Sequence, residues 1–266
     1  MERRVSVIMP CYNDGRYLEE SIGSVLAQEY ENIELVIADD GSTDGFTQRY
    51  LKELAALGSD RVRVLFLPHG GPARARNRAI EAATGDYILP LDADDKIEPP
   101  YVREAAAVLE AEPQTGMVYC RADQFGMQTG AWELPEFEIG KFLIVNSIFN
   151  AALYRKLDWQ RVGGYDESIE NGPEDWEFWL ALLECGLLPH RLDGTYFHYR
   201  RKGTSARSQQ LTHSDVWLEM IRYFAQKHRR LYERHVVEYV QAAQEARVNA
   251  KKRIFRLRQQ LGGEEE

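Results

Sequence analysis

The strongest chemical signal in the sequence is a run of acidic residues that follows a short apolar segment. Residues 87–91 are almost entirely apolar, and Asp92, Ala93, Asp94 and Asp95 come directly after them. Burying such charge without a counter-ion is very unfavourable, so these carboxylates are expected to bind a partner. Acids spaced by one residue on an extended segment point the same way. One of them can then accept a hydrogen bond from a ribose hydroxyl, while the other binds a hard divalent ion that also holds a diphosphate.

The ligand chemistry of these acids predicts Mn²⁺ or Mg²⁺ rather than zinc. Carboxylate oxygens suit hard cations, and no cysteine or histidine pair lies near residues 92–95 in the sequence. A solvated acidic loop is the alternative. It is the less favoured of the two, because the acids follow a segment that reads as a buried strand.

Two further polar clusters also follow apolar segments. In residues 10–14, Tyr12 offers a flat face on which a nucleobase can stack, although an ordinary turn is the favoured interpretation of this cluster alone. Residues 39–42 read Asp-Asp-Gly-Ser, and a carboxylate there can accept a hydrogen bond from the ring N–H of uracil, thymine or guanine. The alternative is a turn in which one of residues 42–44 caps the next helix, which accounts for one acid but not two.

A glycine-rich loop is followed by a helix start that carries three arginines. Gly70, Gly71 and Pro72 precede Arg74, Arg76 and Arg78. Free N–H groups at a helix N-terminus, together with a guanidinium, suit a phosphate or a base carbonyl. Three arginines at alternate positions cannot all share one helical face, so we expect one or two of them to be solvated bystanders.

The elements expected around these clusters form an α/β fold. Patterns of β-branched and apolar residues predict strands at 5–9, 33–38, 61–67 and 86–91, and helical spacing predicts helices at 18–26, 50–57, 73–83 and 102–109. This alternation predicts a Rossmann-like, mainly parallel sheet flanked by helices. Ligands bind beyond the carboxyl ends of such strands, which is where every polar cluster lies.

The rest of the chain is less regular. We expect strand or loop at 117–125 and 131–144, a helix from Pro173 to Cys185 and a strand at 195–200. From His213 onward the sequence becomes helical and strongly charged. A boundary near 206 would separate the α/β domain (1–205) from a C-terminal helical extension (206–266).

Composition narrows the function classes. The chain has 266 residues, 44% of them hydrophobic, with 33 Lys plus Arg against 42 Asp plus Glu and a formal charge of −9. This acidic balance argues against general nucleic-acid binding. Three distant cysteines predict a reducing compartment, without a disulfide framework or a zinc quartet. With no signal peptide and no apolar stretch near ~20 residues, we expect a cytoplasmic chain, or at most a peripheral one at the inner face of the membrane.

Taken together, the motifs resemble a known enzyme family. Residues 5–13 (VSVIMPCYN), 39–42 (DDGS), 75–77 (ARN) and 91–95 (LDADD) are similar, in order and spacing, to family 2 glycosyltransferases of the GT-A fold. The resemblance is strong over about 5–110 and absent beyond about 205. It implies inverting, metal-dependent transfer of a sugar from a nucleotide-diphosphosugar, most simply a UDP-sugar. The acceptor hydroxyl would belong to a glycan or a lipid-linked molecule in cell-surface polysaccharide or glycan synthesis.

The same resemblance implies roles for individual residues. On it, the base lies against Pro10 and Tyr12, the ring N–H is read by Asp39, the nucleotide is held by Arg76, the ribose is bound by Asp92 and the metal is bound by Asp94. His198 and residues 200–205 resemble the segment that closes over the diphosphate and supplies a metal ligand or a cationic side chain. A packed, hydrogen-bonded strand histidine is the alternative for His198.

Residues 172–179 resemble the acidic motif that carries the catalytic base of the family, which makes Asp175 the expected base. A single carboxylate aligned for in-line attack gives inversion of configuration. The alternative is that Glu174 and Asp175 only stabilise a helix start after Pro173. The aromatic residues among 176–179 would form either a shelf for a sugar or part of the core.

Two other function classes remain open. A nucleotidyltransferase would be expected to carry a glycine-rich loop with Lys or Arg after the first strand, where this chain has Pro10 and Tyr12. A non-catalytic sugar-nucleotide or glycan-binding module would have no need for Asp175.

The C-terminal tail carries a separate signal. Residues 247–258 contain six cations and no acids, and apolar residues recur along the tail at heptad-like spacing. Peripheral membrane contact, pairing into a homo-oligomer and packing on the chain's own domain are all compatible with this pattern.

Overall fold

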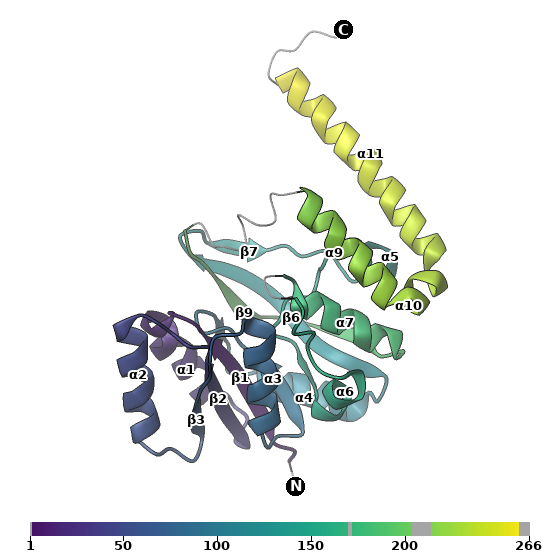
Figure 1. The fold of residues 1–266 in the computed structure, drawn as a ribbon. Coiled ribbons are helices and arrows are strands. Elements are labelled where there is room, and N and C mark those ends of the chain that lie inside the picture. Colours follow the sequence, from purple (N-terminus) through teal and green to yellow (C-terminus); the bar gives the residue numbers. More distant parts are fainter. Residues whose placement is uncertain (1, 170–171, 204–213, 261–266) are drawn as a thin grey trace.

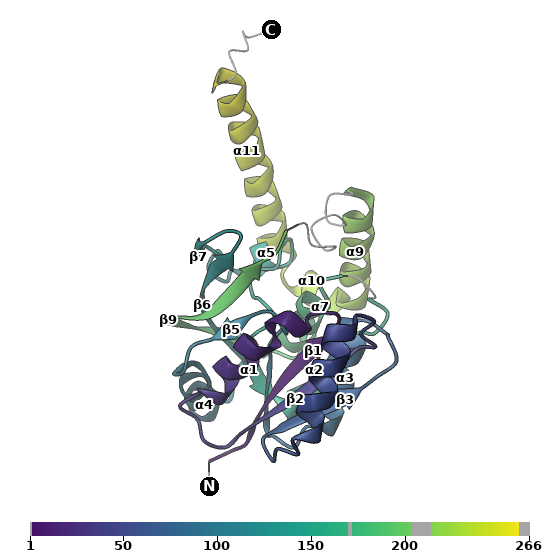
Figure 2. The same ribbon diagram turned by 90° about the vertical axis from the view of Figure 1, so that its left-hand side faces the viewer.

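The computed structural model describes residues 2–169, 172–203 and 214–260, with side chains described except those of 214–216 and 257–260 (Figures 1 and 2). Its centre is one mixed sheet in the strand order β3-β2-β1-β4-β8-β6-β9-β5, with β7 paired to β6. The strands are β1 Val5–Cys11, β2 Ile33–Asp39, β3 Val62–Phe66, β4 Tyr87–Pro90, β5 Lys96–Ile97, β6 Thr115–Gly126, β7 Gly130–Trp132, β8 Leu153–Arg155 and β9 Leu188–Arg201.

Helices flank this sheet (Figures 1 and 2). They are the 3-10 turn η1 Gly15–Tyr17, α1 Leu18–Leu26, α2 Gly45–Ala56, α3 Pro72–Ala82, α4 Tyr101–Ala111, α5 Ile139–Phe142, α6 Lys156–Val162, α7 Glu174–Glu184, α9 Ser214–Lys227, α10 Arg229–Arg234 and α11 Val236–Gln260. The predicted α/β class and the C-terminal helices are therefore confirmed.

The first four neighbouring strands form the parallel part of the sheet. β1 pairs in parallel with both β2 and β4, and β2 pairs in parallel with β3. Every residue of β2 is buried, as is typical of strands covered by helices on both faces. Beyond β4 the pairings are antiparallel except for β6 with β9, so the sheet as a whole is mixed rather than mainly parallel.

The elements predicted for the first 111 residues lie within a few residues of their expected positions. The irregular middle differs more. Residues 131–144 contain the end of β7 and the short helix α5, and β9 extends for 14 residues where a strand was expected only at 195–200. The first half of β9 is polar and half-exposed, and it is held by pairing with the distant strand β6, so a local pattern could not reveal it.

The C-terminal helices pack on α7. Trp176 of α7 is fully buried, and its ring stacks on Trp217 of α9 at 5.7 Å and meets Phe224 edge-on at 5.3 Å. The predicted boundary near 206 falls in 204–213, outside the described residues, so the division into 1–205 and 206–266 stays a prediction. No helix in the described part of the chain combines the length and apolar character needed to cross a membrane.

A buried ionic network reinforces this contact. The Glu177 carboxylate on α7 lies 2.8 Å from His228 Nε2 and 2.8 Å from Lys227 Nζ, while His228 Nδ1 lies 3.1 Å from Glu184. Glu177 and His228 are buried. A buried charge is tolerated only while it is paired, so this network couples α7 to the helices that follow residue 214.

The network makes a stability prediction. Glu177→Ala leaves the buried His228 and the neighbouring Lys227 without their shared carboxylate, and we expect it to lower the free energy of unfolding by about 3–5 kcal/mol. Glu233→Ala is the matched control, because the Glu233–Arg229 pair is exposed and should change stability little. Urea denaturation followed by tryptophan fluorescence measures both. Equal losses in the two variants would contradict the role given to this network.

Candidate active site

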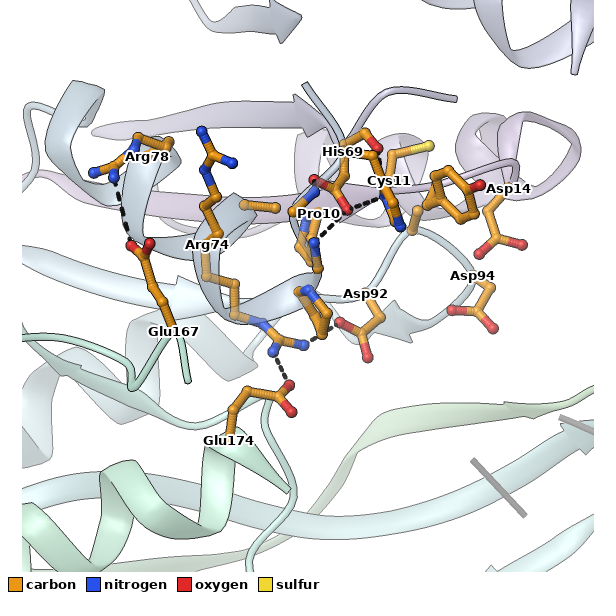
Figure 3. A pocket seen from close by; sticks show the side chains of 18 of the residues that line it. Pro10, Cys11, Asp14, His69, Arg74, Arg78, Asp92, Asp94, Glu167 and Glu174 are labelled. Atoms are coloured by element: carbon orange, nitrogen blue, oxygen red, sulfur yellow. Dashed lines mark hydrogen bonds and ion pairs between the residues drawn. The ribbon is translucent and has the colours of Figure 1, made fainter. Parts of the chain in front are cut away.

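A cavity of ≈ 1030 Å³ lies at the carboxyl ends of the parallel strands (Figure 3). It is lined by the segments that follow β1, β3 and β4, by Asp40 after β2, by the start of α3 and by residues from the segment 167–174. Asp14 and Asp94 lie toward one end in Figure 3, and Arg78 and Glu167 lie toward the other. The volume reaches the upper end of the ~300–1,000 Å³ typical of small-molecule sites, which leaves space for a large ligand.

A buried arginine lies at the centre of this cavity. Arg76 is only 3% exposed, and its Nη2 lies 2.7 Å from Asp92 Oδ1 while its Nη1 forms an ion pair with Glu174. Burial opposes the positive charge, but the two carboxylates outweigh it and raise the pKa of Arg76 well above its ordinary value. Arg76 is therefore a fixed cation that joins α3, the turn after β4 and the start of α7.

A second cation lies beside Asp94. Lys202 Nζ is 2.8 Å from Asp94 Oδ2 and 2.6 Å from Asp14 Oδ1, so one ammonium bridges both carboxylates. Burial raises the pKa of the Asp94 carboxyl above its usual range, although Lys202 opposes the shift. Burial also raises the pKa of Asp95 strongly, and Asp95 Oδ2 is buried with no hydrogen-bond partner in the described structure. Additional positive charge nearby would therefore stabilise the ionised forms of these carboxylates.

The donor set fits the predicted divalent cation in part. Asp94 and Asp14 supply carboxylate oxygens, and a cationic group already lies between them. In the described segments, however, no three His, Cys, Asp or Glu side chains are arranged to hold an ion by themselves. An ion bound at Asp94 would therefore need ligands from a bound diphosphate and from water, as Mg²⁺ commonly does.

One wall of the cavity is aromatic. Tyr12 is 42% exposed, and its ring stacks on His69 with 4.5 Å between the ring centres. The Asp40 carboxylate accepts hydrogen bonds from the N–H groups of Gly70 and Gly71, each at 2.9 Å, and lies 2.8 Å from His69 Nδ1. Asp40 thus holds the glycine loop and the imidazole in place, and the Tyr12–His69 wall presents a flat surface to a planar ligand.

Asp39, unlike Asp40, makes its side-chain contact within the turn that follows β2. It is buried, and its Oδ1 accepts a hydrogen bond from the Ser42 N–H at 3.0 Å, while Asp44 caps α2 by accepting from the Thr47 N–H. Among the described residues, the cavity lining includes Asp40 but not Asp39. One carboxylate oxygen of Asp39 is therefore hydrogen-bonded within the turn after β2. A hydrogen bond from Asp39 to a nucleobase stays a prediction.

Cys11 also lines the cavity, but it is a poor nucleophile. Burial raises the pKa of its thiol to about 12, so the neutral thiol dominates at physiological pH.

The predicted base lies on the first turn of α7. Asp175 is buried, and its Oδ1 accepts a hydrogen bond from the Trp176 N–H at 2.7 Å. Its neighbour Glu174 is the residue of this turn that lines the cavity. Trp176, Phe178 and Trp179 are fully buried, so the aromatic residues of α7 belong to the core rather than to a sugar-binding shelf.

Comparison with known proteins decides the family. Residues 6–166, more than half of the chain, match the family model described as Glycosyl transferase family 2. The chain belongs to this family.

Individual relatives agree with this assignment. A putative glycosyltransferase, EpsE of Bacillus subtilis (strain 168), is 33% identical over 221 residues, which cover 79% of this chain and 78% of that protein. The chondroitin synthase of Pasteurella multocida (strain Pm70) is 30% identical over 190 residues, which cover 70% of this chain but only 19% of that protein. This chain therefore spans about a fifth of the length of that synthase.

A solved structure supports the fold. The crystal structure of S. aureus TarS 1–349 in complex with UDP-GlcNAc aligns with a TM-score of 0.64 at 23% identity, covering 77% of this chain and 60% of that chain. At this level of identity, the likeness establishes a shared GT-A architecture.

Two expectations about the residues that line the cavity differ from the structure. Arg74, Arg76 and Arg78 all line the cavity, whereas one or two of them were expected to be bystanders. That expectation was wrong because the start of α3 borders the cavity, so two faces of the helix reach it: Arg74 and Arg78 share one face and Arg76 lies on another. The acids after β4 do not lie on an extended segment, since residues 93–94 form a turn, yet Asp92 and Asp94 both line the cavity.

His198 lies away from the cavity lining. Its Nδ1 is 2.5 Å from Asp123 Oδ1 and its Nε2 is 2.6 Å from Glu98 Oε1, so both ring nitrogens face carboxylates. This is the packed, hydrogen-bonded environment weighed as the alternative for a strand histidine, and a role in donor binding stays a prediction. From the same segment, the side chain that reaches Asp94 is Lys202.

His69, Asp40 and Glu174 line this cavity but were not singled out from the sequence. Nothing in the sequence around His69 indicated a role, except that it precedes the glycine loop. Asp40 belonged to the 39–42 cluster, in which Asp39 was the residue expected to contact the base. Glu174 was recognised only as the neighbour of Asp175. Its pairing with Arg76, 98 positions away, depends on tertiary contact.

The loop that Asp40 holds yields a prediction. Asp40→Ala leaves the N–H groups of Gly70 and Gly71 without acceptors, and we expect the free energy of unfolding to fall by about 2–4 kcal/mol. Affinity for UDP should also fall, because the Tyr12–His69 wall loses its support. Asp193→Ala is the control, since that side chain is 94% exposed. Urea denaturation and calorimetry measure the two effects, and a variant as stable as Asp193→Ala would contradict the assignment.

Proposed function

We propose that this family 2 glycosyltransferase moves a sugar from a nucleotide-diphosphosugar, with UDP as the nucleotide, to an acceptor hydroxyl with inversion of configuration. The observation that carries the proposal is that one cavity brings together the Tyr12–His69 wall, the Arg76–Asp92 pair and Asp94. A flat wall, a fixed cation and partly exposed carboxylates match the base, the phosphates and the ribose of such a donor. Family membership and the UDP-GlcNAc complex of TarS support it.

The nucleoside half of the donor would occupy the aromatic end. A base stacked on Tyr12 beside Pro10 would place its ring N–H toward the end of β2, where Asp39 would accept a hydrogen bond. Asp92 would accept a ribose hydroxyl while keeping its ion pair with Arg76, because a carboxylate accepts several hydrogen bonds.

The diphosphate would lie near Asp94. Mn²⁺ or Mg²⁺ bound to Asp94 would neutralise the charge that develops on the departing diphosphate. Lys202 is already seated on Asp94 and Asp14, and would turn its ammonium toward the phosphate oxygens. Arg76 stays charged throughout because its pKa is raised.

Asp175 would act as the base on the acceptor. The Trp176 N–H donates a hydrogen bond to Oδ1 and so fixes the orientation of the carboxylate. The carboxylate would take the proton from the acceptor hydroxyl as that oxygen attacks the anomeric carbon from the face opposite the diphosphate. A single base that directs in-line attack by the acceptor would give the inverted product.

The acceptor would be a glycan or a lipid-linked molecule. The name of the chondroitin synthase supports a role in polysaccharide synthesis. A sugar-nucleotide-binding module without catalysis is the competing function, and the base variant below distinguishes the two.

We expect Asp175→Asn to lower the rate of sugar transfer by at least about 10²-fold, because the amide cannot accept the proton. UDP affinity should be unchanged, since the base acts on the acceptor side. Transfer is measured by release of UDP from a panel of UDP-, dTDP- and GDP-sugars, with Asp193→Asn as the surface control. Full turnover in Asp175→Asn would refute the assignment of the base.

Asp94→Ala tests the metal. In the wild-type protein, Mn²⁺ should tighten the binding of UDP, and chelation by EDTA should reverse the effect. In Asp94→Ala the enhancement by Mn²⁺ should disappear, with a loss in affinity of about tenfold, because the ion loses its protein ligand. Titration calorimetry with and without Mn²⁺ measures both proteins. Equal enhancement in the variant would place the ion elsewhere.

A further inference from the structure

The second half of α11 leaves the body of the protein. Every side chain from residue 244 to residue 256 is exposed, whereas Ala242, earlier in the same helix, is buried. Both views show the helix projecting from the end of the molecule opposite the N-terminus (Figures 1 and 2). The described body therefore provides no packing surface for the last turns of this helix.

A helix that projects in this way is expected to bind another surface. Isolated helices shorter than ~12–15 residues are marginal in water, and most helix stability in proteins comes from burying one face. Val248, Ile254 and Phe255 of the projecting part are 47%, 52% and 52% exposed. An apolar surface of this size, left in water on a helix without contacts, indicates that another surface covers it in use.

Beyond Glu245, the charges on the projecting part are all positive. Between Glu245 and residue 256 there are five cations and no acid, in a chain whose formal charge is −9. At about 100° per residue, Val240, Val248, Ile254 and Phe255 fall within about 120° of the helix circumference, and Arg247 and Lys251 fall in the same sector. The docking face is therefore apolar and basic at once.

We propose that this basic apolar face of α11 docks on an anionic phospholipid surface. Isoleucine, valine and phenylalanine would enter the headgroup boundary, while the long basic side chains would extend to the lipid phosphates. A second copy of the chain fits this face less well, because pairing two such helices would bring Arg247 and Lys251 of one copy against the same cations of the other.

The position of the face suits this role. The cavity lies at the carboxyl ends of β1 and β4, and β1 starts beside the N-terminus, so the cavity is displaced toward the end from which α11 projects (Figure 1). Docking would hold that end near the membrane, where lipid-linked substrates are found. The inference rests on α11 alone and does not depend on sugar transfer.

Co-sedimentation of the full chain with vesicles tests the proposal. We expect binding to vesicles of phosphatidylcholine with about one third phosphatidylglycerol, and no binding to phosphatidylcholine alone. Arg247→Glu together with Lys251→Glu should lower the partition coefficient at least about tenfold, and Ile254→Ser with Phe255→Ser should do the same. Arg49→Glu with Lys52→Glu on α2 changes the net charge equally at exposed positions and should bind as the wild type does.

Three results would overturn the proposal. The first is failure of the wild-type chain to bind anionic vesicles. The second is equal loss of binding in the α11 and α2 charge variants. The third is a wild-type dimer, detected by sedimentation velocity, that dissociates on Ile254→Ser with Phe255→Ser, which would assign the face to a second copy. Circular dichroism confirms that each variant is folded, so none of these readouts depends on enzymatic activity.

Discussion

The interaction on which the site depends is the buried ion pair of Arg76 with Asp92 and Glu174. A guanidinium that is 3% exposed is tolerable only while both carboxylates remain beside it. This requirement joins three segments that are far apart in the sequence: the start of α3, the turn after β4 and the first turn of α7. Through it, the cavity lining from α3 and the turn after β4 is held in a fixed position relative to α7, the helix that carries Asp175.

The ion pairs of the cavity contain more negative than positive charge before any ligand enters. Arg76 is shared by Asp92 and Glu174, and Lys202 is shared by Asp14 and Asp94, so two cations face four carboxylates. A donor with an anionic diphosphate would add to this excess of negative charge. In the proposed mechanism a divalent cation offsets it, and Lys202 can move from carboxylate to phosphate because its long stem is flexible.

The helices after residue 214 act on the site through α7. The Trp176–Trp217 stack and the Glu177–His228 contact join α7 to the later helices. The ion pair of Glu174 with Arg76 joins the first turn of α7 to the cavity, so α7 is held by both. A helix held in this way keeps Asp175 oriented. The C-terminal helices therefore support α7, the helix of the proposed base, as well as carrying the projecting part of α11.

The sequence by itself determined the local elements and the clusters of polar residues. In the first 111 residues, the spacing of apolar residues shows which face of each strand or helix is buried, so the elements can be read locally. Pro10, Tyr12, Asp92 and Asp94 lie at the ends of parallel strands, and the parallel topology brings these ends together at one edge of the sheet. Only the tertiary structure decided which groups pair. Glu174 with Arg76, Lys202 with Asp94 and the full length of β9 depend on contacts between distant segments, whose energies leave no local pattern in the chain.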